Sequence, residues 1–186
     1  NPKKRVVFFA IGFETTSPTI AVAILRTKQE GIQNLFFLNS QKRIPPALYA
    51  LLQSRQVKIN GLILPGHVSA ILGTGPYQFI SEEFSIPAVI TGFEPLDILQ
   101  GIWMLARQIE ENRPSVEIQY RRIVKEDGNP LALSRIEEVF EWDDGNWRGI
   151  GLIPGSGYRF RKPFEALDAR QFEVEVEPSK EHADCM

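Results

Sequence analysis

Short apolar runs alternate with segments of helical periodicity over the first two thirds of the chain. The continuous apolar run at residues 5–11 predicts a strand buried on both faces. Ser17 and Pro18 predict a helix start, and Gly31 stands where that helix should end. Further strands are predicted at 35–38, 61–64 and 88–91, and further helices at 45–55, 77–84 and 95–111. This alternation predicts an α/β fold with a mainly parallel sheet flanked by helices.

The pattern loosens after Asn112. Residues 116–124 alternate like an edge strand, 131–140 have helical spacing, and 147–153 lead into a last strand before an acidic tail. We therefore expect an α/β domain of βα units over residues 1–124. Residues 125–186 would add a helix, a final strand and the tail, packing on a second lobe that is absent or incomplete here.

Composition limits the class of protein. The chain has 186 residues, 43% of them hydrophobic, and a net charge of −2, which indicates a folded protein without the basic excess of a nucleic-acid binder. No apolar run approaches the roughly 20 residues of a membrane span. One cysteine and two histidines exclude a complete Cys/His metal site within the chain. Without a recognisable leader, the chain is expected to be a piece of a longer cytoplasmic protein.

The loops after predicted strands carry the candidate chemistry, because ligands of open parallel sheets bind at the carboxyl ends of strands. In the first loop, Gly12 permits a tight turn and Glu14 can transfer a proton, while Thr15 and Thr16 add hydroxyls. The alternative is structural: Thr16 or Ser17 caps the helix and Glu14 interacts with its dipole.

The second loop, Pro65 to Ser69, holds His67, the one histidine outside the tail. Imidazole suits proton transfer near neutral pH, and its place after Gly66 at a strand end predicts that it projects into a cleft. Ser69 would line the same cleft. The alternative is a hydrogen-bonded histidine that only holds the loop.

A third loop repeats the Gly-Phe-Glu of the first, with Gly92 and Glu94 followed by Asp97, for which helix capping is the favoured role. A fourth, with Gly155 and Ser156, could offer backbone amides but lacks the spacing of a phosphate cradle. No Lys or Arg lies between Lys58 and Arg107, so a site built there is expected to lack cationic side chains.

Four long motifs resemble the HypD family of hydrogenase maturation proteins. They are GFETTSPTIAVAIL at 12–25, LILPGHVSAILG at 62–73, ITGFEPLDILQGIWMLARQIE at 90–110 and WRGIGLIPGSGYRFR at 147–161. The resemblance implies a role in building the Fe(CN)2CO group of [NiFe]-hydrogenases, with scaffold and redox or cyanide-transfer functions. It marks His67, Glu14 and Glu94 as candidate catalytic residues in a cleft between two α/β lobes.

The resemblance further implies a HypC-like chaperone and a HypE-like cyanide carrier as partners, and iron and a [4Fe–4S] cluster as metals of the full-length protein. The family's upstream cysteine motifs and downstream cluster region are missing from this sequence, although Cys185 matches what looks like the first cluster cysteine. We therefore expect neither metal on the fragment alone.

Two other functions remain open on the residues alone. One is an α/β enzyme domain that binds a nucleotide or phosphosugar through amides near Gly12, Gly66 and Gly155 at helix N-termini. The other is an interaction module whose basic first block docks an acidic partner.

Overall fold

The computed structural model describes residues 3–54 and 57–175. The described residues divide into two compact units, one of residues 3–43 and 135–175 and the other of residues 44–54 and 57–134. The expected division at residue 124 does not coincide with these units, because the first unit is completed by residues from both ends of the chain.

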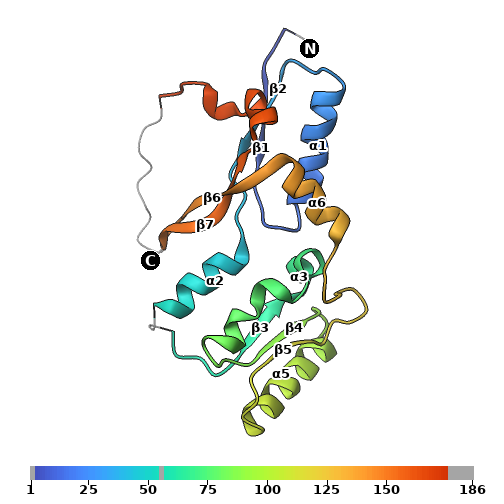
Figure 1. Cartoon of the computed structure of the whole chain (residues 1–186), viewed down its shortest axis with the longest axis vertical. Helices are drawn as coiled ribbons and strands as arrows, with labels where there is room; N and C mark the ends of the chain where they lie inside the picture. Colours follow the sequence, from blue (N-terminus) through green and yellow to red (C-terminus); the bar gives the residue numbers. More distant parts are fainter. Residues whose placement is uncertain (1–2, 55–56, 176–186) are drawn as a thin grey trace. The chain divides into compact units, whose positions relative to one another are not determined.

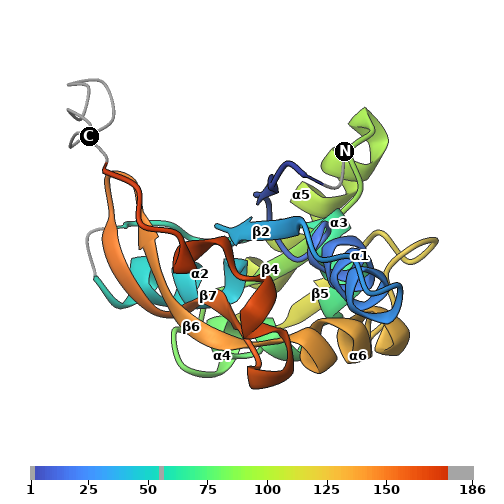
Figure 2. The ribbon, with the colours of Figure 1, turned by 90° about the horizontal axis from the view of Figure 1, so that it is seen from above.

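The first unit contains a parallel pair of strands and an antiparallel hairpin (Figure 1). Its elements are β1 (Val6–Ala10), α1 (Ser17–Gln29), β2 (Leu35–Asn39), β6 (Phe140–Trp147), β7 (Gly151–Phe160), η2 (Lys162–Leu167) and η3 (Ala169–Gln171). As predicted, α1 begins beside Pro18 and ends just before Gly31, which has a φ of +67°. β6 and β7 form a long curved ribbon, and η2 and η3 contact β2 (Figure 2).

β1 corrects one expectation. It is a strand, but it is not buried on both faces: Phe9 is 57% exposed and its neighbours Val6 to Phe8 are about half exposed. The physical reason is that β1 pairs only with β2, so within the described chain it is the edge of a two-stranded sheet.

The second unit is an α/β layer structure around the parallel sheet β3-β4-β5 (Figure 1). Its elements are α2 (Ile44–Gln53), β3 (Leu62–Pro65), α3 (Gly66–Leu72), η1 (Gly75–Tyr77), α4 (Phe79–Glu82), β4 (Ala88–Thr91), α5 (Pro95–Glu110) and β5 (Val116–Ile118); α6 (Pro130–Val139) crosses the boundary between the units. Eight side chains form its buried core: Leu52, Leu64, Tyr77, Ile80, Ala88, Ile90, Ile118 and Val124. The predicted α/β class is confirmed.

Two predicted strands differ from the observed ones. The strand expected at 116–124 ends at Ile118, because the backbone amides of Gln119 and Tyr120 both turn to the carbonyl of Ile90. The strand expected near 147–153 is a hairpin, in which β6 ends at Trp147 and β7 begins at Gly151. In the part of the chain that the structure describes, no helix is long and apolar enough to cross a membrane.

Candidate functional sites on the two units

Three predicted loop glycines follow strand ends as expected. Gly12 follows β1, Gly66 follows β3 and Gly92 follows β4. Gly66 and Gly92 therefore share one edge of the β3-β4-β5 sheet, whereas Gly12 belongs to the first unit. Each unit thus carries its own loop cluster, and the two are described separately.

The first loop turns sharply at Gly12, which has a φ of +127°. This φ favours glycine, and a Cβ at this position would overlap Thr16 Oγ1 unless that side chain moved. The hydroxyls of Thr16 and Ser17 donate to the carbonyl of Phe13 at 3.0 and 3.1 Å. Thr16 is the N-cap residue of α1, as the structural alternative predicted, but its hydroxyl bonds back into the turn and makes no cap hydrogen bond to the helix.

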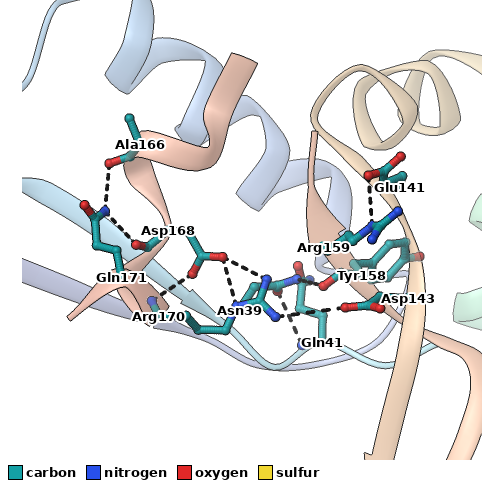
Figure 3. A network of polar contacts seen from close by, with 10 residues as sticks. All are labelled: Asn39, Gln41, Glu141, Asp143, Tyr158, Arg159, Ala166, Asp168, Arg170 and Gln171. Atoms are coloured by element: carbon teal, nitrogen blue, oxygen red, sulfur yellow. Dashed lines mark hydrogen bonds and ion pairs between the residues drawn. The ribbon is translucent and has the colours of Figure 1, made fainter. Parts of the chain in front are cut away.

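Two amide side chains at or just after the end of β2, Asn39 and Gln41, make further contacts, and Figure 3 shows the one between Asn39 and the hairpin. Gln41, which is 1% exposed, donates from Nε2 to Ser17 Oγ at 2.9 Å and to Thr16 Oγ1 at 3.2 Å. Asn39 Nδ2 donates to the Tyr158 carbonyl at 3.0 Å, while its Oδ1 accepts from the Gln41 amide. Asn39 therefore ties the end of β2 to β7, and Gln41 ties the chain after β2 to the loop that follows β1.

The fourth predicted loop is not a loop at all. Gly155 and Ser156 lie inside β7, which is antiparallel, so the expected place beyond a parallel strand is wrong. Gly155, with a φ of +64°, accepts at its carbonyl from Arg43 Nη1 at 2.6 Å. The buried Ser156 hydroxyl accepts from Trp147 Nε1 and donates to the Ile153 carbonyl, both at 2.8 Å. These groups shape the bulged hairpin.

Glu14 is fully buried, whereas Thr15 beside it is exposed. Burial, followed by the negative charge of Glu14, raises the pKa of Tyr158 to about 12. Burial lowers the pKa of Arg43, and the charges of Tyr158 and Glu14 oppose that effect. The first unit therefore places the buried Glu14 carboxyl where its charge acts on both the Tyr158 phenol and the Arg43 guanidinium.

In the second unit, His67 lies in the first turn of α3 and is exposed, as its predicted role requires. Its ring centroid is 4.2 Å from that of Phe93, which links the second loop to the third. Gly66 has no room for a side chain, since a Cβ would overlap the Thr91 carbonyl. Ser69 is buried and donates to the Pro65 carbonyl at 2.9 Å, so its hydroxyl stabilises the helix start and does not line a cleft.

The third loop presents Glu94 to solvent and buries Asp97. The Glu94 side chain is 77% exposed. Asp97 is 4% exposed, and its Oδ2 accepts from the Glu94 amide at 3.4 Å in a capping box, which confirms the predicted capping role. Asp97 also accepts from Arg122 and Gln119. These hydrogen bonds, those of Arg122 first, hold the pKa of the Asp97 carboxyl well below its usual range.

Arginines at both clusters overturn the expectation of sites without cationic side chains. Arg43 reaches the hairpin beside Glu14, and Arg122 reaches the third loop. The expectation failed because it considered only the stretch between Lys58 and Arg107, whereas both arginines lie outside it. Arg43 follows β2, which pairs with β1, and Arg122 follows β5, which pairs with β4. These pairings leave no local signal in the sequence, so the two arginines could not be assigned to the sites beforehand.

The described residues do not supply a ready metal centre. Within residues 3–54 and 57–175, no three His, Cys, Asp or Glu side chains come together in a group able to hold a metal ion. Cys185, the predicted metal ligand, lies outside the described residues.

A cavity of about 730 Å³ lies on the first unit, away from all predicted site residues. Its lining combines apolar and charged side chains from α1, α6 and η2: Val22, Leu25, Arg26, Lys28, Gln29, Arg135, Glu138 and Phe164.

Comparison with known proteins bears on both clusters. The HypD family, described as the hydrogenase formation hypA family, matches residues 1–186. The hydrogenase maturation factor HypD2 of Bradyrhizobium diazoefficiens is 44% identical over 91% of this chain and 46% of its own length. The hydrogenase maturation factors HypD of Rhodobacter capsulatus and Escherichia coli are each 42% identical, over 92% and 91% of this chain and 46% of their lengths.

The chain therefore spans about half the length of the curated relatives it matches. Because the match extends over the whole chain, both loop clusters fall within the shared region. The chain belongs to the HypD family.

Proposed function

We propose that this chain is part of a hydrogenase maturation factor that assembles the Fe(CN)2CO group with HypC-like and HypE-like partners. The observation that carries the proposal is the similarity over nine tenths of the chain to proteins named hydrogenase maturation factors. In this proposal the iron with its cyanide and carbonyl ligands is the substrate, and the factor works in the cytoplasm.

The described residues fit a part in handling protons and small ligands better than a part in holding metal. Among residues 3–54 and 57–175, no three His, Cys, Asp or Glu side chains come together in a group able to hold a metal ion. In this proposal, ligands for the iron and for a [4Fe–4S] cluster are supplied at least in part by other residues. Cys185 remains a proposed cluster ligand.

His67 is the proposed proton-transfer group of the second unit. Its imidazole is exposed, lies against Phe93 and belongs to the same sheet edge as Glu94. Imidazole can donate a proton to a departing small ligand near neutral pH, and a nearby carboxylate can accept one. In the first unit, the buried Glu14 beside Arg43 and Tyr158 is the corresponding proposed acid–base group.

Exposed apolar side chains support the proposed contact with partner proteins. On α5, Leu96 is 78%, Leu99 62% and Trp103 59% exposed. Apolar surface of this kind commonly marks protein–protein contacts.

The test uses a cell that lacks its own HypD and carries a full-length gene containing this chain. His67→Ala is expected to reduce maturation by roughly 10² to 10⁴ in rate, the usual contribution of general acid–base catalysis. Because His67 is exposed, the change should cost under about 1 kcal/mol of unfolding free energy. The exposed Glu82 on α4 is the matched position: Glu82→Ala should leave maturation unchanged.

Full maturation by a folded His67→Ala variant would remove this histidine from the mechanism. Failure of the unmodified gene to restore hydrogenase activity would contradict the proposed function itself. A strong thermal stabilisation of the protein by a nucleotide or phosphosugar would instead favour the alternative class of enzyme.

A further inference from the structure

The two Gly-Phe-Glu loops occupy equivalent positions in the sheet register of their units. In the first unit Ala10 of β1 pairs with Asn39 of β2, and in the second Ile90 of β4 pairs with Ile118 of β5. Counting four residues onward from each of these partners leads to one glutamate and one arginine in both units: Glu14 with Arg43, and Glu94 with Arg122. The chain thus places an arginine opposite the loop glutamate twice.

Arg122 makes the stronger set of contacts with its loop. Its Nη1 donates to Asp97 Oδ1 at 2.8 Å and its Nη2 donates to Asp97 Oδ2 at 2.6 Å, a bidentate pair. The same Nη2 lies 3.8 Å from Glu94 Oε2. The guanidinium also lies over the ring of Tyr120, 4.4 Å from its centroid, and Tyr120 in turn contacts Phe93 edge-on.

The Gln119 side chain also holds the loop through two hydrogen bonds. Its Nε2 donates to Asp97 Oδ1 at 2.9 Å, and its Oε1 accepts from the Gly92 amide at 3.1 Å. The loop is therefore held at its first residue by Gln119 and at its last residue by Arg122. Between these two anchors lie Phe93, which contacts His67, and the exposed Glu94.

Arg43 uses the equivalent position differently. It donates to the Gly155 carbonyl and lies over the Trp142 ring at 4.0 Å, and its charge acts on the buried Glu14 without a fork on the loop. Ser17, which stands where the second unit has Asp97, has no carboxylate to offer a guanidinium. The Arg122 fork is thus specific to the second unit.

We propose that Arg122 is a positioning residue of the candidate site on the second unit. Through Asp97 it holds the Gly92–Asp97 loop so that Phe93 stays against His67 and the Glu94 carboxylate stays beside the guanidinium. This inference rests on the proposed function for its activity readout, but its geometric part can be tested without it. Lysine cannot replace the planar fork, because it carries its charge at a single nitrogen.

The test compares Arg122→Lys, Arg122→Met and Arg121→Met in the 186-residue chain. Arg121 is an exposed arginine at the neighbouring position, which makes it the matched control. The first readout is the nuclear Overhauser contact between the His67 and Phe93 rings; the second is thermal unfolding; the third is hydrogenase maturation with the same change in the full-length gene.

We expect Arg122→Lys to remain folded, to lose most of the His67–Phe93 contact and to lower maturation at least tenfold. Arg122→Met should do the same or unfold, since it leaves Asp97 buried without its charged partner. Arg121→Met should match the unmodified chain in all three measurements.

A folded Arg122→Lys chain that keeps the His67–Phe93 contact would overturn the positioning role. Unfolding of Arg122→Lys would also overturn it, because the arginine would then serve the fold itself. Loss of the ring contact with normal maturation would support the positioning role and contradict the proposed use of the loop in maturation.

Discussion

The same three residues, Gly-Phe-Glu, follow β1 in one unit and β4 in the other, yet their glutamates end in opposite environments. Glu14 is 0% exposed, whereas the Glu94 side chain is 77% exposed. The tripeptide and the preceding parallel strand are therefore not enough to determine the environment of the carboxylate.

The residues that follow make the difference. Pro95 comes directly after Glu94, and a residue before proline is restricted to extended conformations, which Glu94 has with φ −76° and ψ 152°. The helix starts at once and the glutamate points outward as its N-cap. After Glu14 the chain inserts Thr-Thr-Ser before Pro18, and the amides of Thr16 and Ser17 both turn to the Phe13 carbonyl. That extra turn carries Glu14 inward.

The largest expected effect is a difference in unfolding free energy between alanine substitutions at the two loop glycines, Gly92 and Gly12. Gly92→Ala should cost about 3 kcal/mol or more of unfolding free energy, because the new Cβ would overlap Asp97 Oδ2 and lie 2.8 Å from the Tyr120 ring. Gly12→Ala should cost about 1–2 kcal/mol, mainly from its positive φ, since the Thr16 side chain that it meets is exposed and can rotate. Urea unfolding of both variants measures the difference.

Gly75→Ala is the control for these two changes. A Cβ at Gly75 has no neighbour within 4 Å, and the substitution should be nearly neutral. If the Gly92→Ala chain were as stable as Gly75→Ala, the predicted overlap with Asp97 would be contradicted, because the Asp97 side chain would have moved at little cost.

The next effect concerns the two glutamates. Glu14→Gln should lower the unfolding free energy by about 2–3 kcal/mol, because it removes a buried charge that acts on Arg43. Glu94→Gln should stay within about 0.5 kcal/mol, as is usual for exposed positions. Thermal and urea unfolding of the pair measure this contrast, and equal losses would contradict the assigned environments.

The smallest expected effect is a loss of unfolding free energy at acidic pH, caused by protonation of Asp97. The pKa of Asp97 is lowered in the folded state by its hydrogen bonds from Arg122 and Gln119, relative to about 3.9 in an unfolded chain. The stability from ionised Asp97 is therefore complete above about pH 4 and is lost as the pH falls toward the lowered folded pKa. The difference in unfolding free energy between the unmodified chain and Asp97→Asn should shrink from pH 7 to about pH 3.

Ser17→Ala provides the comparison from the first unit. Serine at the equivalent position does not titrate, so the stability difference caused by Ser17→Ala should be the same at both pH values. A difference for Asp97→Asn that is constant with pH would contradict the lowered pKa.

The site could be predicted only in part. The loops at the ends of β1 and β4 followed from strand and helix signals. The loop expected after β3 is wrong, because helix α3 begins at Gly66 directly after the strand and holds the exposed His67 in its first turn. Ser69, Gly155 and Ser156 were expected to line a cleft, but the structure gives Ser69 a helix-start hydrogen bond and places the other two in a hairpin. A hydroxyl that bonds its own turn and one that faces a ligand have the same sequence signal, so periodicity could not distinguish them.

The sequence by itself determined the α/β elements, because proline restricts where helices begin, glycine allows the turns that end them, and continuous apolar runs form strands. Only the tertiary structure places Arg122 on the second Gly-Phe-Glu loop and Arg43 on the hairpin, and makes one glutamate buried while the other is exposed. The physical reason is that these features depend on which strands pair and in which register, and such pairing between distant residues leaves no local periodic signal.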